Sequence, residues 1–167
     1  MKVNAVIKIT IGSLLAISAL KQVIGQETWW FIQNVNLIFH EAGHVIFMFF
    51  GETLHILGGS LLEVTVPTMV TIHFYRSQQL FSASCTSWWT ATAFLSVAIY
   101  AGDASKRALP LITRDVSTHD WYNLLLKFNL LRYEDLFAYT FTICALISIF
   151  MIGYFLSKDK DVRSLGG

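Results

Sequence analysis

Five apolar stretches dominate the pattern along the chain, and each is long enough to cross a lipid bilayer as a helix. A hydrocarbon core about 30 Å thick needs roughly 20 apolar residues in helical conformation. The stretches cover residues 3–24, 29–50, 56–75, 80–101 and 136–156. The third contains Glu63 and Pro67, which predicts an irregular span there. We expect an all-α membrane protein, a bundle of about five transmembrane helices forming one domain over residues 1–167.

The only long polar segment, residues 102–135, lies between the fourth and fifth apolar stretches. Within it, residues 121–131 are mostly apolar but too few to span a bilayer. This pattern predicts a short helix that lies along the membrane interface. The charged and polar residues before it are candidates for chemistry at one membrane face.

Composition supports the membrane assignment. Hydrophobic residues make up 54% of the 167 residues and charged residues only 14%, against about 25% charged in a typical soluble domain. The mean hydropathy is +0.55. A net charge of +1 provides no basic field for nucleic acid. Cys85 and Cys144 lie far apart in apolar stretches and indicate neither a disulfide framework nor a Cys-x-x-Cys metal site. We expect a lipid bilayer as the surroundings and no nucleic-acid partner.

The second apolar stretch contains the motif H-E-x-x-H, from His40 to His44. Residues i and i+4 lie on one face of a helix, so both imidazoles can reach one metal ion. Glu41, beside them, can act as general base toward a metal-bound water without occupying a coordination position. Two imidazoles and a carboxylate base suit Zn²⁺, although Fe²⁺ or Co²⁺ fits the same ligands. The motif predicts one zinc ion per chain.

A polar stripe extends this motif along the same helix face. Gln33 and Asn36 fall on the side that carries the two histidines, and Asn36 is a candidate to orient a metal ligand. Ionisable side chains within an apolar stretch are expensive to insert, which favours a functional role. The alternative is a buried polar cluster that holds helices together.

A catalytic zinc site requires a third protein ligand. Because successive spans alternate in direction, the end of the fourth stretch lies on the same membrane face as the end of the motif helix. Asp103 follows the fourth stretch directly, and His119 lies in the polar segment beyond it, so both are within reach. Asp120, next to His119, is a candidate to orient an imidazole, and it stays, with His119, a rival to Asp103 for the third ligand position.

The intramembrane H-E-x-x-H followed two spans later by an Asp resembles the site-2 protease family of membrane-embedded zinc metalloproteases. Compact bacterial membrane proteins of that broad type carry runs similar to F-H-E-A-G-H, L-H-I-L-G-G-S, A-L-P-L and H-D-W, which stand here between Phe39 and Trp121. The resemblance implies His40, His44 and Asp103 as zinc ligands and Glu41 as the general base, while the position of His119 in the sequence keeps it as the alternative third ligand. It also implies a multi-pass protein of the bacterial cell membrane that hydrolyses peptide bonds of membrane proteins or peptides.

A second function class stays open at the level of sequence. The same residues could form a non-catalytic metal site with a structural, sensory or transport role. The two classes differ in what Glu41 does, because only an enzyme needs its carboxylate as a base.

Overall fold

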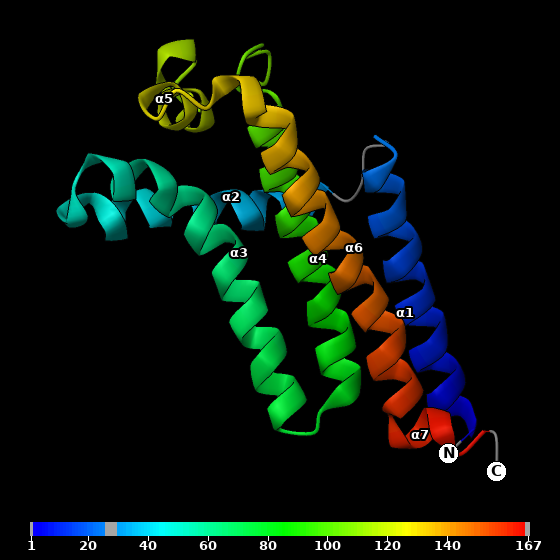
Figure 1. Ribbon diagram of the computed structural model, residues 1–167. Coiled ribbons are helices and arrows are strands. Elements are labelled where there is room, and N and C mark those ends of the chain that lie inside the picture. Colours follow the sequence, from blue (N-terminus) through cyan, green and yellow to red (C-terminus); the bar gives the residue numbers. More distant parts are fainter. Residues whose placement is uncertain (1, 26–29, 166–167) are drawn as a thin grey trace.

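Helices make up the regular structure of the part of the chain that the computed structural model describes, residues 2–25 and 30–165 (Figure 1). The α-helices are α1 (Lys2–Val23), α2 (Trp30–Phe47), α3 (Glu52–Arg76), α4 (Leu80–Gly102), α5 (Asp120–Lys127), α6 (Glu134–Lys158) and α7 (Lys160–Arg163). Three 3-10 turns, η1 (Met48–Phe50), η2 (Val116–Thr118) and η3 (Leu131–Tyr133), lie between them. No strand occurs in these residues, so the expected all-α fold is confirmed.

Three segments are long and apolar enough to cross a membrane: Val3–Val23, Glu52–Arg76 and Leu131–Lys158. They correspond to the first, third and fifth predicted spans. The five-span expectation is therefore not confirmed by length and composition, because α2 and α4 are not among these segments. Trp29, the predicted first residue of the second span, lies outside the described residues.

Helix α4 occupies the centre of the bundle, where it packs against α1, α3 and α6 (Figure 1). It is rich in serine and threonine, which lowers its hydropathy. Several of these hydroxyls donate to carbonyls of the preceding turn, as Thr86 does to Ser82 and Thr90 does to Thr86, both at 3.0 Å. A helix surrounded by other helices can carry such residues because protein, rather than lipid, covers it.

Helix α2 lies across the direction of α1, α4 and α6, and the first part of α3 runs beside it (Figure 1). Helix α3 then changes direction and continues along α4. It remains one helix through Glu63 and Pro67, where the sequence predicted an irregular span. Close packing joins α2 to α3: a Cβ at Gly58 would lie 2.7 Å from Cβ of Phe47 and 2.8 Å from the carbonyl oxygen of Gly43. The glycine lets the two backbones approach each other.

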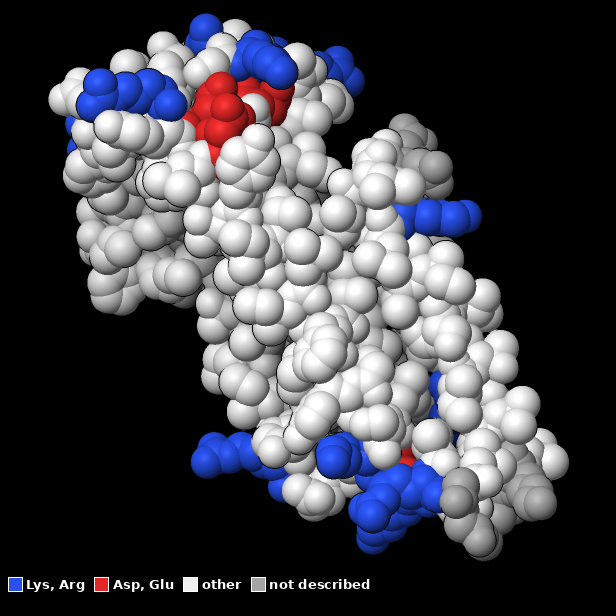
Figure 2. Space-filling view, turned by 45° about the vertical axis from the view of Figure 1, so that its right-hand side comes forward, with Lys and Arg blue, Asp and Glu red and all other residues white. Residues whose placement is uncertain are grey.

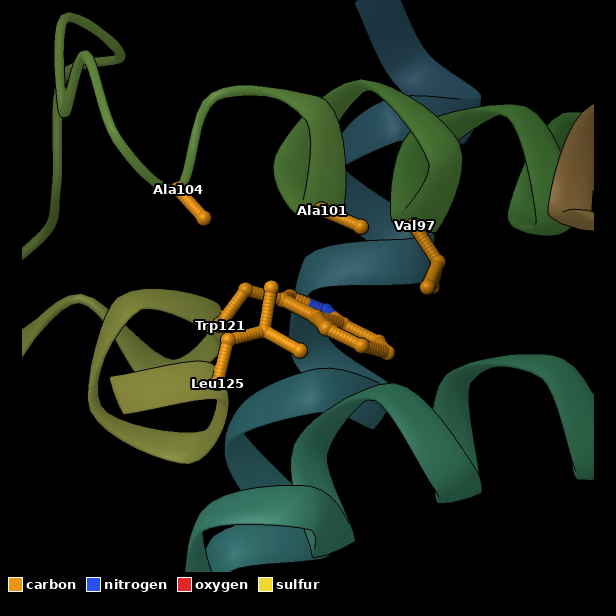
Figure 3. Close-up of a cluster of buried hydrophobic side chains, with 5 residues drawn as sticks. All are labelled: Val97, Ala101, Ala104, Trp121 and Leu125. Carbon is orange, nitrogen blue, oxygen red and sulfur yellow. The ribbon is translucent and has the colours of Figure 1, made fainter. Parts of the chain in front are cut away.

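The short helix predicted at residues 121–131 is present as α5, which begins at Asp120 and ends at Lys127. Its Trp121 and Leu125 are buried in a cluster with three residues of or just after α4, namely Val97, Ala101 and Ala104 (Figure 3). The indole Nε1 of Trp121 also donates to Oγ of Ser60 in α3, at 3.0 Å. These contacts attach the start of α5 to α3 and α4, at the end of the bundle where α2 lies.

Candidate metal centre

The two histidines of the motif meet a carboxylate from a distant helix. Asp120 Oδ2 lies 2.9 Å from His40 Nε2 and 3.1 Å from His44 Nε2. The three atoms that could bind a metal lie within 4.8 Å of one another. Among the described residues, His40, His44 and Asp120 are the one group of at least three His, Cys, Asp or Glu side chains whose ligand atoms lie this close together.

The other ring nitrogen of each imidazole, Nδ1, lies within hydrogen-bond distance of an acceptor. His40 Nδ1 lies 3.0 Å from Oε2 of Glu63, which is 3% exposed, and His44 Nδ1 lies 2.8 Å from the carbonyl oxygen of His55. An acceptor at Nδ1 favours the tautomer with its hydrogen on that atom, which leaves the lone pair on Nε2. Both Nε2 atoms face Asp120, and a metal ion bound to these lone pairs would replace the hydrogen bond that each Nε2 makes with the carboxylate.

Gly59 of α3 keeps the space beside these nitrogens open. A Cβ at this position would lie 2.6 Å from Nε2 of both His40 and His44. Any other residue would thus contact the two ligand atoms themselves. The donor set, two imidazole nitrogens and one carboxylate oxygen beside a cleared space, fits a zinc ion with one position left for water or substrate.

Asp120 is positioned by its own helix end and by Tyr100 of α4. The backbone N–H of Asp120 donates to the Tyr100 hydroxyl at 2.9 Å, and that hydroxyl lies 3.4 Å from Oδ2 of Asp120. Burial alone would raise the pKa of the Asp120 carboxyl, but the hydrogen bonds with His40 and His44 outweigh it and lower the pKa. The carboxylate is therefore in its anionic, metal-binding form.

Glu41 lines a cavity of about 960 Å³ that also contains His40, His44 and Asp120. It follows the first ligand histidine directly, and its carboxylate stands apart from the ligand group. The role of Glu41 as a general base therefore stays a prediction of the motif.

The sequence-based candidates for the third ligand, Asp103 and His119, lie elsewhere. The Asp103 carboxylate accepts hydrogen bonds from the backbone N–H groups of Ala108 and Leu109, at 3.1 and 2.9 Å. His119 is fully buried, its Nδ1 accepts from the backbone N–H of Tyr122 at the start of α5, and its Nε2 lies 3.5 Å from Asp103. Both residues hold the segment before α5, and neither belongs to the group that contains His40 and His44.

His119 also differs electrostatically from the two motif histidines. Burial lowers its pKa below the ordinary histidine value, in spite of the opposing effect of Asp103. The His119 imidazole is therefore uncharged at neutral pH, as its capping role requires, because only an unprotonated Nδ1 can accept a hydrogen bond.

Asn36, the other residue expected to orient a ligand, is fully buried between α2 and α4. Its Oδ1 accepts a hydrogen bond from Nε1 of Trp89, at 2.9 Å. This bond fixes the position of α2 on the bundle. Asn36 thus helps to position α2, the helix that carries the motif, and it does not belong to the group of His40, His44 and Asp120.

Sequence reasoning did not assign partners to three residues that shape the site. Glu63 stood out only as a charge within an apolar stretch and Gly59 as part of a Gly-Gly pair, and Tyr100 did not stand out at all. The isolated charge was a usable signal, because a buried carboxylate requires a partner. Nothing in the sequence indicated that the partner is His40.

Replacing Glu63 by Gln is expected to weaken zinc binding by about 10–100-fold. The amide keeps the shape of the side chain but loses the charge that orients His40 and raises the basicity of its Nε2. Zinc affinity is measured by competition with a chelating dye. The matched control is Glu52→Gln on the same helix, where the carboxylate pairs with Lys127 at the surface. Equal affinities in the two variants would contradict the role of Glu63.

No protein-family model matches the sequence, and comparison with curated proteins and with solved structures found no match. The likeness to site-2 proteases therefore rests on the motifs of this chain, and the assignment of function depends on the geometry described above.

Proposed function

We propose that this protein is an intramembrane zinc metalloprotease, with one zinc ion per chain bound by His40, His44 and Asp120. One observation supports this proposal most directly: Nε2 of both motif histidines converges on a single carboxylate oxygen, within about 3 Å. Zinc binds imidazole nitrogen at about 2.0–2.1 Å and carboxylate oxygen at about 2.0–2.2 Å. Because the three ligand atoms already lie close together, small movements of the three side chains would bring them to these distances from one ion.

The proposal names Asp120 as the third ligand in preference to Asp103 and His119. The carboxylate of Asp103 is already bonded to two backbone N–H groups, and Nδ1 of His119 caps α5. Moving either side chain to the motif histidines would break these bonds. Asp120 needs no such rearrangement.

Glu41 supplies the acid–base chemistry of the proposed reaction. A bound zinc ion polarises a carbonyl and lowers the pKa of its water toward 7. The Glu41 carboxylate takes the proton from the attacking water and delivers it to the nitrogen of the leaving amine. The peptide C–N bond breaks, and a carboxylate and an amine leave the site.

A membrane location agrees with the distribution of charge. On the face shown in Figure 2, most Lys, Arg, Asp and Glu side chains gather toward the two ends of the molecule and leave a wide uncharged band between them. We propose that α4 crosses the bilayer together with α1, α3 and α6, while α2 lies along the membrane near one boundary. The proposed active site is then close to the surface of the bilayer.

The test is zinc-dependent hydrolysis by the purified protein in detergent micelles. A mixture of synthetic apolar peptides is incubated with the protein, and the products are identified by mass spectrometry. Cleavage is expected to stop when a chelator removes the metal and to resume when zinc is restored. One bound zinc per chain without any cleavage would instead favour the structural, sensory or transport role.

A further inference from the structure

The cavity at the proposed active site extends along one face of α2. Gln33, Leu37, His40, Glu41 and His44 all line it, and their spacing places them within one strip of the helix surface. From Gln33 to His44 the helix rises about 16 Å, at 1.5 Å per residue. An extended peptide advances about 3.3 Å per residue, so this strip matches the length of about five extended residues.

Part of the cavity lining outside α2 is apolar. Residues 109–113, in the irregular segment before α5, line the cavity together with Ile56 of α3 and Ile99 of α4. Leu109, Leu111 and Ile112 contribute aliphatic side chains to this segment. The cavity lining thus combines a polar strip of α2, which carries His40 and His44, with an apolar part from residues 109–113.

The charges in the cavity are of one sign. Glu41, Glu63 and Asp120 line it, and no Lys or Arg of the described chain does. An acidic side chain or a phosphate headgroup would meet these carboxylates without a Lys or Arg to pair with, which is unfavourable in a partly buried site.

We propose that the strip of α2 from Gln33 to His44 and residues 109–113 form the two walls of a groove for an extended, largely apolar peptide segment of about five residues that lacks acidic side chains. This inference rests on the proposed protease function. His40 and His44 lie toward one end of the strip, about 10 Å and about 16 Å from Gln33 along the helix axis. About three residues of the segment therefore lie on the Gln33 side of the bond that is cleaved.

Two neighbouring positions on α2 provide the test. Leu37 lines the groove, whereas Ile38 is 66% exposed and does not line it. Leu37→Trp fills the groove and should lower kcat/KM for an apolar ten-residue peptide by at least about tenfold, because displacement of a substrate from its reactive geometry is costly. Ile38→Trp adds the same bulk outside the groove and should change kcat/KM by less than about twofold. Zinc content should be one ion per chain in both variants.

A peptide series tests the charge selectivity. Asp placed two residues to the Gln33 side of the cleaved bond should lower kcat/KM by at least about tenfold relative to Asn at the same place. Equal rates for the Asp and Asn peptides, or equal effects of Leu37→Trp and Ile38→Trp, would overturn the groove while leaving the protease function intact.

A binding measurement separates the two proposals. A fluorescent apolar ten-residue peptide should bind to the Glu41→Gln protein, and Leu37→Trp in that background should weaken the binding, whereas Ile38→Trp should not. Binding with this dependence, in a protein whose native form hydrolyses no peptide, would support the groove and overturn the protease. Displacement of the peptide by neutral lipid but no dependence on Leu37 would identify the cavity as a lipid site and overturn the groove.

Discussion

Asp120→Ala is expected to remove zinc from the protein, with an affinity loss of more than about 3 kcal/mol. Structural zinc sites bind with about 10–16 kcal/mol in total, so one of three or four ligands contributes several kcal/mol. Asp120 is the only carboxylate within 3.1 Å of both ligand nitrogens among the described residues. The measurement is zinc per chain after dialysis, by elemental analysis, followed by chelator competition.

The matched control for this substitution is Asp103→Ala. Asp103 lies 17 positions earlier, and its carboxylate holds the backbone of Ala108 and Leu109. Its loss should lower the free energy of unfolding by about 1–3 kcal/mol and leave the zinc content unchanged. Retention of zinc in Asp120→Ala would contradict its role as a ligand. Loss of zinc in Asp103→Ala would then support the ligand that the resemblance to site-2 proteases implied, and loss in His119→Ala the alternative from the sequence.

Glu41→Gln is expected to reduce hydrolysis by about 10²–10⁴-fold, the usual contribution of a general acid–base group. The amide has the size of the carboxylate but cannot accept the proton of the attacking water. Glu41 is outside the ligand group, so zinc content and thermal stability should stay at the native values. The rate is measured with the peptide mixture and the metal by elemental analysis.

His44→Ala provides the contrast, because it removes a ligand and should abolish zinc binding and hydrolysis together. A Glu41→Gln protein that cleaves peptides at the native rate would rule out the proposed chemistry. The site would then be a metal site in which Glu41 has no catalytic part.

The sequence alone determined the local structure of this protein. Apolar stretches predicted the long helices, because burial of an apolar surface by lipid or protein depends mainly on composition over about 20 residues. The apolar run at residues 121–131 likewise predicted a short helix, which the structure has at residues 120–127. The four-residue spacing of His40 and His44 places them together on α2 whatever the rest of the chain does, since helix geometry is local.

The direction of the helices was not predictable from the same pattern. Residues 29–50 were expected to cross the bilayer, but α2 lies across the bundle, with its polar face toward a cavity. Hydropathy reports what surrounds a helix and not how the helix is oriented. Here the glycine contact with α3 and the hydrogen bond between Asn36 and Trp89 determine the orientation.

The partners of the motif were decided by the tertiary structure. Glu63 is 23 residues from His40, and Asp120 is 80 residues from it. Within the dipeptide His119-Asp120, the sequence favoured His119 as a metal ligand and gave Asp120 an orienting role. In the structure, His119 turns inward and accepts the Tyr122 N–H at the N-cap of α5. Trp121 is anchored between α3 and α4, and Asp120 contacts the two histidines of α2. A chain of 167 residues offers many Asp and His side chains at such separations, and only the packing of α5 on α3 and α4 selects the one that reaches the motif.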